Sequence, residues 1–118
     1  LSPMQKKRYF KRLKPEQVHS TSDEEFYELR SPIREHVSFF RLNLADPPFP
    51  MHGPFDVIFC RNVMIYFDKP VRRNLVRELD RLLANNGVLF VGHAETLTGL
   101  QSRLHMLKPS IYFKAATT

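Results

Sequence analysis

Two short apolar runs with an amphipathic helix between them constrain this chain more than any other feature. The first is residues 55–60, "FDVIFC", and the second, "GVLFVGH", begins at Gly87. Continuous apolar runs of this length are typical of strands that are buried on both faces, as in a parallel sheet. Strand, helix and strand with short connections predict a right-handed βαβ unit in an open α/β sheet.

The segment between the two runs carries the signals of a helix. Asp68 can cap its first turn, and Pro70 fits a position where no backbone donor is needed. Asn85-Asn86-Gly87 is typical of a helix end. Apolar residues recur at intervals of three and four, and most basic side chains fall on the other side. The apolar positions are Val71, Leu75, Leu79, Leu82 and Leu83.

Shorter elements are expected before the first run. A basic helix over residues 3–13 ends at Pro15, a polar loop or irregular hairpin covers residues 16–25, and residues 26–30 form a short strand. Ser31-Pro32 predicts one helical turn through His36. Residues 37–44, "VSFFRLNL", predict a further strand because they begin with β-branched and aromatic residues.

The end of the chain predicts an antiparallel hairpin. Residues 104–107 and 111–114 are the two strands, and Lys108-Pro109-Ser110 separates them. Together with the βαβ unit, this hairpin closes an α/β sheet.

Polar side chains stand where three of the expected strands end. Arg61 and Asn62 follow the first apolar run, Asn43 lies near the end of the strand expected at 37–44, and residues 93–95 follow the second run. Open α/β sheets bind ligands at the carboxyl ends of their strands. We therefore expect a ligand crevice at this edge.

The residues at these strand ends carry a family resemblance. "FDVIFCRNVMIYFD", followed by a helix and "NNGVLFVGHAETL", resembles the CheR-type chemotaxis receptor methyltransferases, as do "RYF" and "VSFFRLNLADP" in the same order. The resemblance covers nearly the whole chain. It implies a Rossmann-like methyltransferase sheet and methyl transfer from S-adenosylmethionine to glutamate side chains on the cytoplasmic helices of chemoreceptors.

The resemblance also implies roles for five residues. Asn43, Leu44, Arg61 and Asn62 would contact the cofactor, and Tyr66 would lie near the transferred methyl group. Each has a plainer interpretation: Asn43 can satisfy a turn, Arg61 can pair with an acid such as Asp68, and Tyr66 can belong to the core.

Other reactive residue types receive structural roles. His93 and Glu95 are expected to shape the loop after the second apolar run rather than to form a catalytic dyad, and Cys60 to be a small buried residue. The five histidines lack metal-ligand spacing, so no metal site is predicted.

One part of the family's cofactor domain has no counterpart in this chain. The family's sheet begins with an acidic, glycine-rich cofactor loop, whereas this chain has four glycines and none are grouped. We therefore interpret residues 1–36 as a basic helix with a small inserted β-subdomain, and residues 37–118 as the C-terminal half of the methyltransferase domain. Alone, this chain should bind cofactor weakly or not at all, unless the missing N-terminal half or a strand-exchanged second chain completes the site. Residues 14–25 lack the glycines associated with binding a receptor tether.

Composition narrows the partners without naming one. The formal net charge is +6 and the pI about 9.8, which favours acidic partners. No stretch is apolar enough for membrane insertion and none resembles a signal peptide, so a cytoplasmic protein is expected.

Two rival functions remain open at this stage. One is a methyltransferase-like interaction module without catalysis. The other is an adenine-specific DNA methyltransferase, suggested by "DPPF" at residues 46–49. In those enzymes the motif follows the strand that corresponds to "DVIFC", whereas here it precedes that strand. This order disfavours the DNA methyltransferase hypothesis and nucleic acid as a partner.

Overall fold

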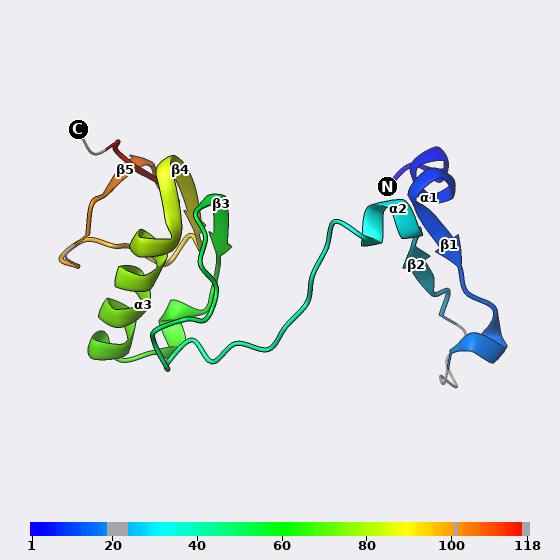
Figure 1. Ribbon diagram of the computed structural model, residues 1–118, viewed down its shortest axis with the longest axis horizontal. Coiled ribbons are helices and arrows are strands. Elements are labelled where there is room, and N and C mark those ends of the chain that lie inside the picture. The colour runs from blue at the N-terminus through cyan, green and yellow to red at the C-terminus, as the bar shows by residue number, and fades with distance from the viewer. Residues whose placement is uncertain (19–23, 101, 117–118) are drawn as a thin grey trace. The chain divides into compact units, whose positions relative to one another are not determined.

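The structure is a computed structural model that describes residues 1–18, 24–100 and 102–116 (Figure 1). Its internal contacts divide the chain into two compact units, residues 1–41 and residues 42–118. Among the described residues, no helix has the length and apolar character needed to cross a membrane.

The unit of residues 1–41 is built from a capped helix and a two-stranded sheet. Helix α1 (Pro3–Tyr9) begins with a reciprocal cap, in which the Ser2 hydroxyl accepts from the Gln5 N–H and the Gln5 side chain accepts from the Ser2 N–H. The helix was predicted to reach residue 13, which is wrong. Phe10–Arg12 is instead strand β1, because its backbone pairs antiparallel with β2 (Tyr27–Leu29).

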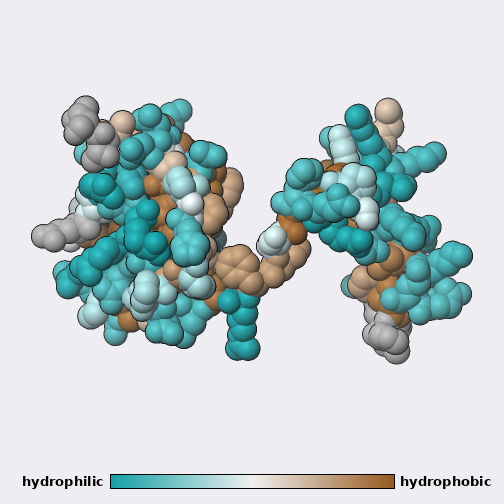
Figure 2. All heavy atoms as spheres, in the orientation of Figure 1, coloured by the Kyte–Doolittle hydropathy of each residue, from teal (hydrophilic) through white to brown (hydrophobic). Residues whose placement is uncertain are grey.

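Two short helical turns complete this unit. The 3-10 turn η1 (Pro15–Gln17) follows β1, and α2 (Ser31–Arg34) confirms the turn predicted at Ser31-Pro32. Part of the loop predicted at 16–25 lies outside the described residues. The face of this unit in Figure 2 is mostly hydrophilic.

The strand predicted at residues 37–44 is wrong, since none of these residues lies in a strand. A strand needs a neighbour to take up its backbone N–H and C=O groups. In the part of the chain that the structure describes, no strand pairs with this segment. Phe39 and Phe40 are accordingly 90% and 62% exposed.

The unit of residues 42–118 contains a four-stranded sheet in the order β3-β4-β6-β5. Strands β3 (Phe55–Cys60) and β4 (Leu83–Val91) are parallel and joined through the 3-10 turn η2 (Met64–Tyr66) and helix α3 (Lys69–Leu82). Strands β5 (Leu104–Lys108) and β6 (Ile111–Lys114) form the predicted antiparallel hairpin, and β6 pairs with β4. The α/β fold with a βαβ unit and a closing hairpin is confirmed.

Side chains cap both ends of α3. The Asp68 carboxylate accepts from the Val71 N–H at 3.3 Å, as predicted. At the other end the buried Lys114 ammonium donates to the carbonyls of Asp80 at 2.6 Å and Leu83 at 2.9 Å. The helix ends at Leu82, ahead of the expected Asn85-Asn86-Gly87 signal, and Asn86 takes a left-handed conformation (φ 64°) within β4.

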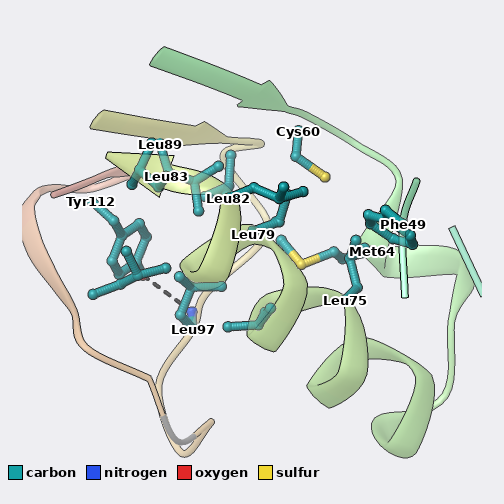
Figure 3. Close-up of a cluster of buried hydrophobic side chains, with 13 residues drawn as sticks. Phe49, Cys60, Met64, Leu75, Leu79, Leu82, Leu83, Leu89, Leu97 and Tyr112 are labelled. Carbon is teal, nitrogen blue, oxygen red and sulfur yellow. Dashed lines mark hydrogen bonds between the residues drawn. The ribbon is translucent and has the colours of Figure 1, made fainter. Parts of the chain in front are cut away.

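The core lies between α3 and one face of this sheet (Figure 3). Leu75 and Val76 of α3 and Leu89 and Val91 of β4 are fully buried. The expectation that both apolar runs are buried on both faces is wrong for β3. Its alternate residues Val57 and Phe59 are 49% and 71% exposed, because the described residues place α3 on one face only. Figure 2 shows hydrophobic side chains on the β3 side of this unit.

The proline-rich segment before β3 is attached to α3 through one buried carboxylate. Glu78 accepts from the Phe49 N–H at 2.9 Å, and Arg81 donates to the Glu78 carboxylate and to the Phe49 carbonyl. Phe49 itself is 5% exposed and belongs to the core. The aromatic residue of the DPPF motif therefore packs inside the protein.

Candidate functional site

The loops after β3 and β4 meet at the carboxyl end of the parallel pair. Glu95, in the loop after β4, is 7% exposed, and its two carboxylate oxygens accept three backbone N–H groups. Oε1 accepts from Asn62 at 2.7 Å and from Gly92 at 2.8 Å, and Oε2 accepts from Met64 at 2.7 Å. This confirms that Glu95 shapes the loop. His93 is exposed.

Gly92 permits this close approach of the two loops. A methyl group at its Cα would stand 2.3 Å from the Asn62 Oδ1 and 2.8 Å from the Glu95 Oε1. Carbon and oxygen atoms cannot approach so closely without displacement. A larger residue at this position would have to displace the Asn62 or the Glu95 side chain, so the glycine favours the contact between the loops.

Three of the five predicted site residues lie on the short connection from β3 to α3. Asn62 has a left-handed backbone (φ 61°), a conformation in which asparagine is several-fold enriched over most residues. Arg61 precedes it and is exposed. Tyr66 ends η2, donates its backbone N–H to the Val63 carbonyl, and is 80% exposed.

An apolar hollow of about 460 Å³ adjoins this connection. Leu44 and Arg61 both line it, so the structure brings together two predicted cofactor residues from distant parts of the sequence. Pockets for small ligands are commonly apolar, measure about 300–1,000 Å³ and hold a few polar groups. The other lining residues come from the 42–51 segment, β3, the β3–α3 connection and α3: Leu42, Phe49, Met51, Phe55, Val57, Ile58, Phe59, Cys60, Val63, Leu79 and Leu82.

Asn43 stands apart from this group. Its side-chain oxygen accepts from the Ala45 N–H at 3.0 Å, which is the turn interpretation considered for it. Among the described residues, no hydrogen bond or ion pair joins it to Arg61, Asn62 or Tyr66. The expected alignment of three strand ends therefore reduces to two, because residues 37–44 are not a strand.

The plainer interpretations of Arg61 and Tyr66 gain no support. Among the described residues, Arg61 forms no ion pair, and in particular none with Asp68. Tyr66 projects from the surface rather than into the core. Both side chains are therefore accessible to a ligand.

Cys60 lies beneath the same loops. Burial raises the pKa of its thiol to about 11, and the negative charge of Glu95 acts in the same direction. At neutral pH the thiol is therefore protonated, and at 8% exposure it serves as a small buried residue, as predicted. No group of three or more potential metal ligands occurs among the described residues.

A βαβ unit, a closing antiparallel hairpin and polar side chains at the carboxyl ends of parallel strands are the arrangement of part of a Rossmann-like methyltransferase domain. The chain belongs to the CheR methyltransferase family. The family description "CheR methyltransferase, SAM binding domain" matches residues 1–113.

Curated relatives agree with this membership. The chain is 37% identical over 112 residues to a chemotaxis protein methyltransferase of Salmonella typhimurium, covering 95% of this chain and 37% of the relative. It is 38% identical over 104 residues to the protein of the same name from Borreliella burgdorferi, covering 88% and 36%. The Escherichia coli protein gives 37% over 112 residues, covering 95% and 37%. The chain thus spans little more than a third of the length of these relatives.

Two residues of the site were missed or underrated from sequence alone. One is Gly92: a glycine directly after a buried strand is a signal of close backbone approach. Glu95 was expected only to shape its own loop, and the sequence offered no sign that it also contacts the loop after β3.

Proposed function

We propose that this chain is part of a cytoplasmic methyltransferase that transfers methyl groups from S-adenosylmethionine to glutamate side chains of chemoreceptors. Family membership and the names of the relatives support this activity. The observation that carries the proposal is the shared placement of Arg61, Asn62 and Tyr66 on one connection at the carboxyl end of β3, with Leu44 and Arg61 lining one hollow.

The residues present suit this cofactor. The apolar wall that includes Leu44 suits a purine ring, and the Arg61 guanidinium can hold the carboxylate of the amino acid end. Asn62 offers both a donor and an acceptor, as does the part of the Asn43 amide that its turn leaves available. We assign cofactor contact to Asn43, Leu44, Arg61 and Asn62.

The proposed chemistry asks little of the protein beyond orientation. S-Adenosylmethionine supplies a methyl group on a positively charged sulfur. The accepting glutamate has a reference pKa near 4.3, so it is ionised at neutral pH without a general base. Tyr66, exposed on the same connection as Arg61 and Asn62, is suited to orient the incoming carboxylate. Orientation of this kind contributes up to about 7–11 kcal/mol to lowering a barrier.

The domain division of the parent protein belongs to the same proposal. Residues 1–36 are the inserted β-subdomain with its basic helix, and residues 37–118 are the C-terminal half of the cofactor domain. The chain's length relative to its relatives supports a longer parent, so the remaining part or a strand-exchanged copy is proposed to complete the site.

A chimera tests the activity. The 112 matched residues of the Salmonella typhimurium relative are replaced by those of this chain, and methyl transfer to Salmonella chemoreceptor membranes is measured with labelled cofactor. We expect transfer by the chimera. A folded chimera that binds the cofactor product, S-adenosylhomocysteine, but methylates nothing would favour the interaction-module hypothesis.

Within the chimera, Arg61→Ala tests the cofactor assignment. It should weaken S-adenosylhomocysteine binding by about 1.5–3 kcal/mol, the contribution of a hydrogen bond to a charged group. Arg73→Ala, which removes an exposed arginine of α3, is the matched control and should leave binding unchanged. Titration calorimetry measures both, and an unchanged dissociation constant in Arg61→Ala refutes the assignment.

The DNA methyltransferase hypothesis is disfavoured by the burial of its motif. Phe49 is in the core and its backbone is held by Glu78 and Arg81, so this aromatic ring is not available to stack on a base.

A further inference from the structure

Glu95 joins two loops that are more than thirty residues apart in sequence. Its oxygens reach Asn62 and Met64 in the loop after β3, at separations of 33 and 31 residues, and Gly92 in its own loop. Its own backbone N–H donates to the Gly92 carbonyl at 3.1 Å, which fixes the start of the side chain. The Glu95 side chain therefore links the loop after β4 to the loop after β3, and we call this link the brace.

A core-filling role does not account for this side chain. A buried carboxylate is costly unless hydrogen bonds satisfy it, and a leucine would fill similar space without that cost. Among the described residues, Glu95 forms no ion pair with a basic side chain. Its charge is instead balanced by three backbone N–H groups, all at 2.7–2.8 Å, the range of strong charge-assisted bonds.

The two oxygens act on different parts of the proposed site. Oε1 holds the N–H of Asn62, whose left-handed backbone sets the direction of a proposed cofactor-binding side chain. Oε2 holds the N–H of Met64, the first residue of η2, and η2 ends at Tyr66. One carboxylate thus fixes the cofactor side and the acceptor side together.

We propose that Glu95 is a positioning residue of the methyltransferase, setting Asn62 through one carboxylate oxygen and Tyr66 through the other. The inference rests on the proposed function for its catalytic meaning. The brace itself rests only on the hydrogen bonds.

Glu95→Gln tests the proposal because glutamine has the same shape and only one acceptor oxygen. If that oxygen takes the Oε1 place, it keeps the bonds from Asn62 and Gly92, and the new NH₂ group faces the Met64 N–H donor. The opposite orientation would lose two bonds rather than one, so the first is favoured. The variant should therefore release η2 and Tyr66 while holding Asn62.

The measurable result is a split between turnover and cofactor affinity. In the chimera, Glu95→Gln should lower kcat at least about tenfold, the smaller effect expected for a lost charge-assisted bond, and change the S-adenosylhomocysteine dissociation constant less than about threefold. Glu35→Gln, which neutralises an exposed glutamate of the 1–41 unit, is the matched control and should change neither. Equal losses in kcat and affinity, or no loss in either, would overturn the proposal.

A second measurement covers the case in which Glu95→Gln does not fold. In the wild-type 118-residue chain, NMR couplings transmitted through hydrogen bonds should connect the Glu95 carboxyl carbon with the amide nitrogens of Asn62 and Met64. Their absence from a folded spectrum would overturn the brace. If the couplings are present but the wild-type chimera binds no cofactor product, the proposed function fails and the brace stands.

Discussion

The two faces of the four-stranded sheet differ sharply although they are made by the same strands. On the face covered by α3, Leu89 and Val91 are fully buried. On the other face, Phe59 stacks on Phe90 of the neighbouring strand at 4.8 Å between ring centroids, yet remains 71% exposed. The covered face holds the core, whereas no helix or strand among the described residues of the 42–118 unit covers the apolar open face.

The covered face also contains two buried charged side chains, Lys114 and Glu78, and both are hydrogen-bonded. Lys114 caps the end of α3, and Glu78 holds the proline-rich segment beside it. Stability in this unit therefore depends on α3 and its contacts, whereas the open face can vary with little cost. Three experiments examine that distinction, ordered by expected effect.

The largest expected difference separates Leu89→Ala from Phe59→Ala. Removing a fully buried leucine leaves a cavity and should cost about 2–5 kcal/mol in the free energy of unfolding. Removing the exposed phenylalanine should cost less than about 1 kcal/mol, mainly through lost stacking. Urea unfolding of the chain measures both. Equal costs would mean that the open face is packed in solution.

Lys114→Met comes next. The methionine keeps most of the volume but loses two hydrogen bonds from a charged donor to the carbonyls of Asp80 and Leu83. We expect a loss of about 1.5–3 kcal/mol, measured by the same unfolding. Lys108→Met, at an exposed position of β5, is the control. A neutral Lys114→Met would show that apolar packing alone suffices at the helix end.

The smallest effect is pH-dependent and concerns Glu78→Gln. Hydrogen bonds from Arg81, and then from the Phe49 N–H, hold the pKa of Glu78 below its ordinary value of 4.5, although burial opposes them. A carboxylate with a lowered folded-state pKa stabilises the fold above its unfolded pKa and loses that effect as pH falls through the folded pKa.

Glu78→Gln should therefore destabilise the chain at about pH 7, and its difference from wild type should shrink toward about pH 3. Thermal unfolding across this range checks the trend. A difference that is constant with pH would show that the carboxylate's charge is not what holds the proline-rich segment.

Much of the fold followed from local sequence signals. The cap at Asp68 and the closing hairpin are specified by residues close together in the chain. The parallel pairing of β3 with β4 follows from the order strand, helix, strand with short connections. The wrong predictions concern segments whose structure depends on whether a neighbouring strand is present to pair with them. Residues 37–44 have strand-forming composition but no paired neighbour among the described residues, and Phe10–Arg12 left the helix because β2 lies beside it.

The same distinction between local signals and long-range contacts applies to the candidate site. Arg61, Asn62 and Tyr66 could be found because one continuous motif contains them. The link from Glu95 to Asn62 and Met64 could not, since it depends on how two distant loops meet after the sheet has formed. The direct roles of Asn43, Leu44, Arg61, Asn62 and Tyr66 toward a cofactor and substrate stay predictions.

The solitary thiol at the end of β3 gives the protein a built-in reporter. Cys60 is shielded from solvent and remains protonated at neutral pH, so an alkylating reagent should label it only after the strand loosens from α3. Cys60 is the single cysteine of this sequence, so the rate of alkylation measures how often the end of β3 opens locally, next to the proposed catalytic loops.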